Sequence, residues 1–175
     1  LLLIDLLTSV QKAILSYFSS LLKKQRPVDE VRVILVGNGG SGKTSLVKRF
    51  FGESFDENET NTTGIDRRNR KIDIKNLQIE QAQKTINTHF WDFGGQQIMQ
   101  ATHQFFLSKR ALYILVLDGR KEEDVEDWLK LIQSFGGYSS VLIVLNKMDM
   151  HPSFDLNRKF LKQKFNMIKG FYPVS

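Results

Sequence analysis

Cysteine is absent from the 175 residues, and no apolar run is long enough to cross a membrane. Without cysteine there can be no disulfide framework, zinc ribbon, iron–sulfur cluster or thiol catalysis. A reducing compartment is therefore permitted, and we expect the protein to be cytoplasmic. Asp5, Gln11 and Lys12 interrupt the Leu-rich start, so the stretch of about 18 apolar residues that a transmembrane helix requires does not occur there.

Histidine is scarce, and acidic residues are missing from one region. His89, His103 and His151 lie in no pattern typical of a catalytic site, and we expect structural roles for them. The formal net charge of +6 suits an anionic partner such as phosphate. The basic stretch Arg158–Ser175 contains no acid, but aromatic residues there fall on an apolar helical stripe. We therefore expect a helix with a solvated basic face and no nucleic-acid partner.

The first 26 residues form a separate unit in the sequence. Apolar residues between Leu3 and Leu22 recur at spacings of three and four, which predicts an amphipathic helix. Pro27 ends this helix at or before Arg26. Since the chain does not start with Met, we expect a fragment in which residues 1–26 are a linker or the end of a preceding domain. A membrane-surface helix is the alternative, although we do not expect the membrane as a partner.

From residue 31 onward, short apolar runs alternate with helical periods, which predicts an α/β fold with a mainly parallel sheet. Three continuous apolar runs, 31–36, 111–117 and 141–145, indicate buried interior strands. Two alternating runs, 72–79 and 85–91, indicate an antiparallel pair at one edge of the sheet. The remaining predicted elements are helices at 45–51, 97–107, 122–135 and 155–165 and a last short strand at 171–174.

The segment after the first strand fits the phosphate-binding pattern G-x-x-x-x-G-K-[ST]. A phosphate must be met by a ring of backbone N–H groups, and glycine lets the chain curl tightly enough to supply them. Lys43 reaches the β- and γ-phosphates, Thr44 offers a hydroxyl to Mg²⁺, and the helix that begins there adds its positive dipole end. The predicted phosphate-binding residues are Gly37, Asn38, Gly39, Gly40, Ser41, Gly42, Lys43, Thr44 and Ser45.

A carboxylate followed by two glycines comes directly after the strand at 85–91. Asp92, at the carboxyl end of this strand, can hold Mg²⁺ through a water molecule. The backbone N–H of Gly95 can meet a γ-phosphate, and Gln96 can orient an attacking water. The pattern D-x-G-G is by itself a common turn, and it gains meaning from the phosphate loop that precedes it.

The pattern N-K-x-D follows the strand at 141–145 and indicates a guanine site. Guanine presents N1–H and N2–H₂ as paired donors that the carboxylate of Asp149 can accept together, whereas an adenine site needs no carboxylate facing the base. Lys147 can lay its aliphatic stem along the base. Asn146 can brace the phosphate loop.

The three motifs, in this order, resemble the Ras-like GTPase superfamily, and the resemblance covers residues 31–175. The closest sub-pattern is the Roc domain of Roco proteins, carried by W-D-F-G-G-Q-Q at 91–97, H-Q-F-F-L at 103–107 and Y-I-L-V-L-D-G-R at 113–120. Arf-type GTPases share W-D-x-G-G-Q and an amphipathic N-terminal helix. The resemblance implies a P-loop NTPase, with a Ras-like six-stranded, mostly parallel sheet flanked by helices. Ser175 matches the serine of the last guanine motif, so we expect truncation before the last helix.

The resemblance also implies the residues that complete the site. Thr62 corresponds to the switch I threonine that completes the Mg²⁺ and γ-phosphate contacts, with Thr60 and Thr63 as alternatives. Phe55 matches the aromatic residue that packs against the base, and Ser175 adds to the guanine pocket. The implied metal ligands are Thr44, Thr62 and Asp92, and the implied catalytic residues are Lys43, Thr62 and Gln96.

The implied activity is slow hydrolysis of GTP to GDP and phosphate, with Mg²⁺ as cofactor, in a signalling switch that works by positioning and charge stabilisation. No arginine stands at a recognisable catalytic position, although Arg67, Arg68 and Arg70 lie near switch I in the sequence. We expect the stretch 66–84 to be a hairpin extension or an interaction surface, and favour a solvated hairpin.

Roc domains usually follow a leucine-rich repeat and precede a COR dimerisation domain, so we expect these partners and count homodimerisation among the assemblies. Two alternative functions stay open. The first is a non-hydrolysing guanine-nucleotide-binding scaffold for dimerisation. The second is an Arf-like membrane switch that uses residues 1–22.

Overall fold

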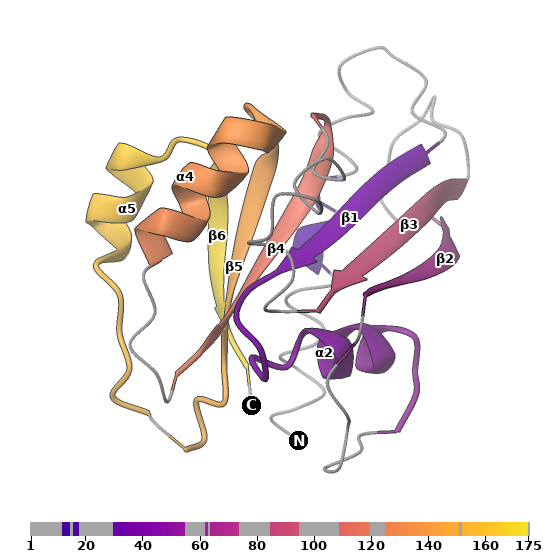
Figure 1. The fold of residues 1–175 in the computed structure, drawn as a ribbon, viewed down its shortest axis with the longest axis horizontal. Helices are drawn as coiled ribbons and strands as arrows, with labels where there is room; N and C mark the ends of the chain where they lie inside the picture. The colour runs from indigo at the N-terminus through magenta and orange to yellow at the C-terminus, as the bar shows by residue number, and fades with distance from the viewer. Residues whose placement is uncertain are drawn as a thin grey trace.

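A six-stranded sheet organises the chain. The computed structural model describes residues 12–14, 16–17, 30–54, 62, 64–73, 85–94, 109–119, 125–150 and 152–174. Within this part the strand order is β2-β3-β1-β4-β5-β6 (Figure 1). The elements are β1 Glu30–Val36, α2 Lys43–Phe50, β2 Ile65–Asp73, β3 Thr85–Phe93, β4 Ala111–Asp118, α4 Val125–Gly136, β5 Ser140–Asn146, α5 Arg158–Lys164 and β6 Ile168–Pro173.

Strand direction follows the predicted pattern. β2 runs antiparallel to β3 at one edge, and every other pairing in the sheet is parallel. β4 is buried along its whole length, as its continuous apolar run requires for a strand covered on both faces. β3 alternates buried and half-buried residues, which is typical of a strand with one covered face. The predicted α/β fold with a mostly parallel sheet is confirmed.

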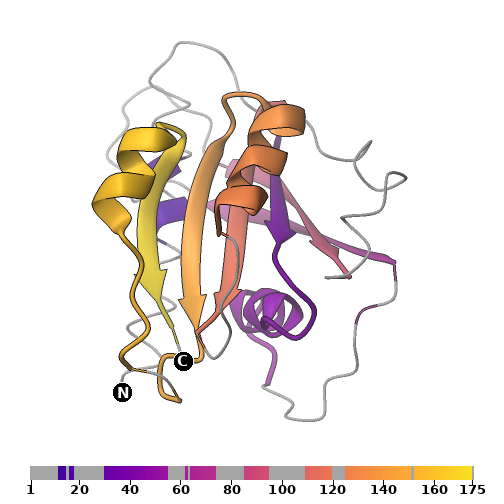
Figure 2. The ribbon, with the colours of Figure 1, turned by 60° about the vertical axis from the view of Figure 1, so that its left-hand side comes forward.

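Helices cover both faces of the sheet. α4 and α5 lie beside each other on one face (Figure 2), where Trp128, Leu129 and Ile132 join a core with the apolar side chains of β4 and β5. α2 lies on the opposite face, where Val47 and Phe50 pack with apolar side chains of β1, β3 and β4. Each face therefore buries its own apolar cluster, which fixes the position of α2 relative to the strand ends.

The described part of the N-terminal segment packs against the same face as α2. Ile14 is only 1% exposed and lies in the apolar cluster there, and Ala13 and Tyr17 pack against that cluster. The Tyr17 hydroxyl donates to the Ala111 carbonyl oxygen at 3.5 Å, and burial raises the pKa of Tyr17. Part of the apolar stripe predicted at the start of the chain is thus used inside this fold.

The element boundaries differ from the predictions in one instructive place. The edge strand β2 begins at Ile65, whereas the sequence predicts a strand only from Ile72. Residues 66–71 are polar or charged and carry no alternation, because β2 is an edge strand whose side chains meet solvent and α2 rather than a second layer. The predicted helix at 97–107 lies outside the described residues.

The parallel strands bring the predicted motifs to a common edge. β1, β3, β4 and β5 all run in one direction, so their carboxyl ends meet there, followed by residues 37–42, 94, 119 and 147–149 respectively. Open α/β sheets bind ligands at this edge. Among the described residues, no helix is both long and apolar enough to span a membrane.

Candidate functional site

The loop between β1 and α2 is shaped by glycines. Gly42 has a φ of 95°, and a Cβ there would lie 2.1 Å from Asn146 Nδ2. A Cβ on Gly37 would lie 2.1 Å from the Val116 carbonyl oxygen. Only glycine tolerates both the positive φ and the close approach of neighbouring chain. The loop therefore curls against β4 and β5 at the N-terminus of α2.

Lys43 lies within the curl of this loop. Its side chain is buried, and Nζ donates to the carbonyl oxygens of Gly37 and Asn38, each at 3.0 Å. Ser41 is also buried, and its Oγ finds no hydrogen-bond partner among the described residues. Gly39 and Gly40 form the turn of the loop, and Ser45 lies in the first turn of α2. A buried ammonium and the positive end of a helix together favour an anion here.

The loop after β5 is tied to the phosphate loop by two side chains. Asn146 Nδ2 donates to the Ser41 carbonyl oxygen at 2.8 Å, and its Oδ1 accepts from the Lys147 backbone N–H at 2.9 Å. Lys147 Nζ donates to the Gly40 carbonyl oxygen at 2.5 Å. Asp149 is exposed in the turn that follows. Residues predicted to hold the base thus contact the residues predicted to hold the phosphates.

Asp118, at the end of β4, is a site residue that the sequence reasoning missed. Its side chain is 1% exposed, and Oδ2 accepts from Lys147 Nζ at 3.0 Å. The signal was a single carboxylate closing an otherwise apolar strand at the ligand-binding edge. Burying a charge is costly unless it is paired, so this pairing holds Lys147 in place.

A cluster of oxygen atoms lies at the start of α2. Thr44 Oγ1 is 2.7 Å from Thr62 Oγ1 and donates to Asp92 Oδ2 at 2.5 Å. Asp92 is 1% exposed, and its other carboxylate oxygen has no hydrogen-bond partner among the described residues. The three predicted metal ligands therefore meet, although they come from α2, the segment before β2, and β3.

Burial raises the pKa of the Asp92 carboxyl. The hydrogen bond from Thr44 and the ammonium of Lys43 oppose this rise, Asp66 adds to it, and Arg68 opposes it. One carboxylate and two hydroxyls are the hard oxygen ligands that Mg²⁺ prefers. The unpaired carboxylate oxygen of Asp92 fits such an ion. No cluster of three or more His, Cys, Asp or Glu side chains arranged to bind a metal occurs in the described part.

The three arginines near switch I all make contacts away from the phosphate loop. Arg68 pairs with Glu53 and Asp66, Arg70 donates to the Phe50 carbonyl oxygen, and the Arg67 guanidinium lies 5.2 Å from the Trp91 ring centroid. Several predicted site residues lie outside the described residues, namely Phe55, Thr60, Thr63, Gly95, Gln96 and Ser175.

A family model described as "Ras of Complex, Roc, domain of DAPkinase" matches residues 32–149, which run from β1 to the turn after β5. The chain belongs to the Roc family. The resemblance to the Ras-like GTPase superfamily is thereby confirmed, and the Roc domain is a switch domain of that superfamily.

Relatives of this Roc domain include both Roco and Rab proteins. The probable serine/threonine-protein kinase roco11 of Dictyostelium discoideum is 34% identical over 127 residues, which cover 70% of this chain and 8% of that protein. The Ras-related protein Rab-12 of Homo sapiens is 31% identical over 140 residues, covering 77% of this chain and 54% of that protein. The Roc domain thus spans a small part of its Roco relatives.

A solved structure from Methanosarcina barkeri shares the fold. It is described as Roco2 RocCORdC bound to GDP, and it is 57% identical to this chain with a TM-score of 0.75. The alignment covers 86% of this chain and 44% of the other. The similarity supports the P-loop, Ras-like fold of the Roc domain.

Proposed function

We propose that this Roc domain binds GTP and GDP together with Mg²⁺ and hydrolyses GTP slowly to GDP and phosphate. One observation carries the proposal: the hydroxyl of Thr44, beside the buried ammonium of Lys43, lies between Thr62 and Asp92. Phosphate and metal ligands therefore adjoin at the N-terminus of one helix. The GDP bound to the Methanosarcina barkeri protein supports the same ligand here.

The phosphate end of the nucleotide would bind the loop at 37–44. Backbone N–H groups, the positive end of α2 and Lys43 would share the negative charge. Mg²⁺ would be held by Thr44, Thr62 and Asp92, and it would neutralise the charge on the phosphate oxygens.

The base would bind the loop after β5. The carboxylate of Asp149 would accept the two guanine donors, and the stem of Lys147 would lie along the ring. Asn146 connects this loop to the phosphate loop, so base and phosphates are read by connected residues. Phe55 and Ser175 stay predictions for the same pocket.

Hydrolysis would proceed by in-line attack of water on the γ-phosphate. Gln96 would orient the water, the Gly95 N–H would meet the γ-phosphate, and Thr62 would complete its contacts. We propose slow turnover because Arg67, Arg68 and Arg70 are engaged elsewhere in the fold. A supplied arginine typically accelerates such reactions by about 10³ to 10⁵.

The test is release of phosphate in a single turnover from the GTP-loaded full-length protein. Gln96→Leu should keep the nucleotide bound and slow this release about tenfold or more, because the side chain acts on water rather than on the ligand. Fluorescent GDP titration of the same variant is the control for binding. A variant as fast as the parent would remove Gln96 from the mechanism, and a parent that binds GTP without releasing phosphate would favour the dimerisation scaffold.

We propose a COR domain after this Roc domain, a leucine-rich repeat before it, a homodimeric assembly and a cytoplasmic location. Two relatives support the COR neighbour: the Methanosarcina barkeri RocCORdC structure and the "Roc-COR-CHAT protease" of Runella zeae, which is 29% identical over 163 residues. The lack of cysteine is compatible with a reducing compartment. Residues 1–26 are proposed to belong partly to this domain, because Ile14 is buried against its sheet. A liposome flotation assay tests the membrane alternative, which predicts binding to lipid.

A further inference from the structure

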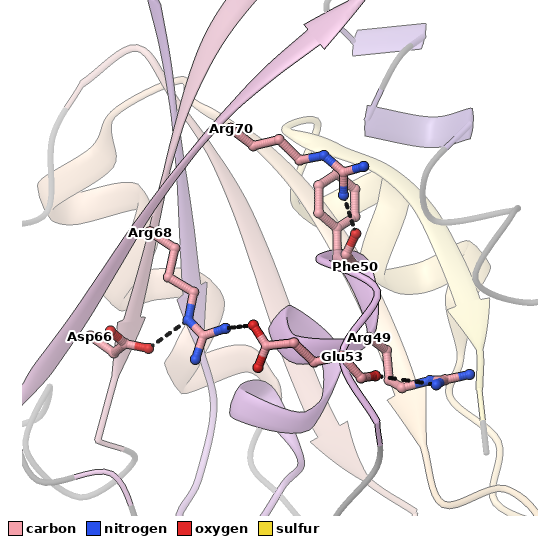
Figure 3. Close-up of polar contacts among 6 residues, drawn as sticks. All are labelled: Arg49, Phe50, Glu53, Asp66, Arg68 and Arg70. Carbon is pink, nitrogen blue, oxygen red and sulfur yellow. Dashed lines mark hydrogen bonds and ion pairs between the residues drawn. The ribbon is translucent and has the colours of Figure 1, made fainter.

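Arg68 joins the segment that leaves α2 to the segment that enters β2. Its Nη1 donates to Glu53 Oε1, and its Nε donates to Asp66 Oδ2 at 2.9 Å (Figure 3). Glu53 lies just after α2, and Asp66 lies at the start of β2. Two nitrogen atoms of one planar guanidinium therefore hold carboxylates from two segments, a geometry that the single ammonium of lysine does not reproduce.

The surroundings of Arg68 restrict its movement. Its side chain is 24% exposed, and the guanidinium lies 5.8 Å from the Phe51 ring centroid. Arg70, two residues along the same face of β2, donates to the Phe50 carbonyl oxygen at the end of α2. Figure 3 shows both arginines reaching from β2 toward the end of this helix. The contact between β2 and α2 is thus built by two neighbouring arginines.

Glu53 is itself held in place by the end of α2. Its backbone N–H donates to the Lys48 carbonyl oxygen at 2.9 Å, and its carbonyl oxygen accepts from Arg49 Nη1 at 3.2 Å. Arg68 therefore pairs with a residue whose backbone is fixed. An ion pair with one fixed partner loses less conformational entropy when it forms than a pair between two mobile side chains.

Thr62 lies between Glu53 and Asp66 along the chain. Thr62 is one of the three residues of the oxygen cluster, through its contact with Thr44. Asp66, the second residue that Arg68 binds, lies directly opposite Asp92 in the register of β2 and β3. Arg68 therefore binds one residue on each side of Thr62, and one of them faces a proposed metal ligand.

We propose that Arg68 is a positioning residue: by tying Glu53 to Asp66 it holds Thr62 against Thr44 and slows the release of Mg²⁺ and guanine nucleotide. This inference rests on the proposed function. Removing the guanidinium also leaves Glu53 and Asp66 as like charges that repel each other, so an attraction across the segment becomes a repulsion.

The experiment measures the rate at which fluorescent GDP leaves the full-length protein, in Mg²⁺ and in EDTA. Arg68→Gln should release GDP about threefold to tenfold faster than the parent in Mg²⁺. In EDTA the two rates should converge, because Thr62 then has no ion to hold. Arg68→Lys should fall between parent and Arg68→Gln, because it keeps the charge and loses the second contact.

Two further variants separate positioning from general loss of structure. Arg67→Gln removes the same charge from the neighbouring residue, whose guanidinium lies over Trp91, and it should release GDP at the parent rate. Glu53→Gln combined with Arg68→Gln should release GDP more slowly than Arg68→Gln alone, because it relieves the repulsion. If Arg68→Gln fails to fold, as judged by circular dichroism, Glu53→Gln alone carries the test and should release GDP faster in Mg²⁺ only.

The outcomes distinguish this inference from the proposed function. A parent that binds no GDP overturns the function itself. A parent that binds GDP, with Arg68→Gln releasing it at the parent rate in Mg²⁺, overturns the role of Arg68 alone. Equal acceleration in Arg67→Gln, or acceleration that persists unchanged in EDTA, also overturns it.

Discussion

The two ends of the candidate nucleotide site are built differently. At the phosphate end Ser41, Lys43 and Asp92 are buried: Lys43 donates to backbone carbonyl oxygens, and Asp92 accepts from the Thr44 hydroxyl. At the base end Asp149 is exposed in a turn. Buried charged contacts contribute strongly to affinity, whereas an exposed carboxylate that pairs with two ligand donors acts chiefly on the choice of ligand. We infer that the phosphate end supplies binding strength and the base end supplies selectivity.

The largest effect should come from the base end. Asp149→Asn places an amide N–H₂ where guanine presents its own N2–H₂, whereas xanthine carries a carbonyl at that position. The variant should therefore prefer xanthosine over guanosine nucleotides. A site built on paired hydrogen bonds can discriminate by about 10⁴ or more when one partner is wrong, so we expect a reversal rather than a weakening.

Competition between GDP and xanthosine diphosphate on the full-length protein measures this preference. The result that decides the test is which of the two nucleotides binds more tightly. If Asp149→Asn still selects GDP, Asp149 does not read the base, and the guanine assignment fails with it.

The next effect in size should come from the phosphate end. Lys43→Ala removes a buried ammonium from a loop in which no other described lysine or arginine is buried. Truncating one partner of a buried charge pair costs about 2 to 5 kcal/mol, which corresponds to a loss of GDP affinity of about 30-fold to about 4,000-fold. Titration with a fluorescent GDP analogue checks this, and GDP and xanthosine diphosphate should weaken together. Unchanged affinity would remove the assignment of the phosphate loop.

A smaller effect, on thermal stability, should come from Asp92→Asn, and its sign should differ between the metal-free protein and the protein with Mg²⁺ and GDP. Burial raises the pKa of this carboxyl, so without metal the ionised form is disfavoured, and the cost appears as the pH rises through the pKa of the folded state. At neutral pH and without metal, Asp92→Asn should therefore be more stable than the parent, by about 1 kcal/mol or 2 to 4 °C in Tm. Near pH 4 the difference should shrink, because a larger fraction of the parent carboxyl is then protonated.

With Mg²⁺ and GDP present, the order should invert, because the parent gains stability from the metal and Asp92→Asn gains less. Thermal unfolding followed by circular dichroism measures the difference in Tm between parent and variant. The four conditions are neutral pH and near pH 4, each with and without Mg²⁺ and GDP. A variant that is less stable than the parent in every condition would show that Asp92 serves the fold and not the metal.

The sequence predicted the interior of the sheet better than its edge. β4 and β5 follow from continuous apolar runs, because a strand covered on both faces has no polar positions to obscure it. β2 escaped detection over residues 65–71, because its arginines gain their stability from α2 and not from an alternating pattern. Local sequence predicts which residues are buried, but it does not predict which residue a charged side chain will pair with.

The same limit applies to the candidate site. The motifs at 37–44 and 146–149 and the ligand pair Thr44 and Asp92 could be identified because each has a fixed spacing from a strand end. Asp118 and Arg68 could not, because their roles depend on which distant side chain they meet: Lys147 for one, Glu53 for the other. Such pairings are decided only when the strands have been ordered in the sheet.

The link from Asn146 to Ser41 has a consequence for the size of ligand that the Roc domain accepts. Because the Asn146 amide bonds to the Ser41 carbonyl oxygen, the base loop and the phosphate loop are held at a set distance from each other. A ligand that occupies only the base loop or only the phosphate loop gains no contacts from the other loop. Guanosine without phosphates and triphosphate without a base should each bind far more weakly than the whole nucleotide. The site would therefore select its ligand by length as well as by chemistry.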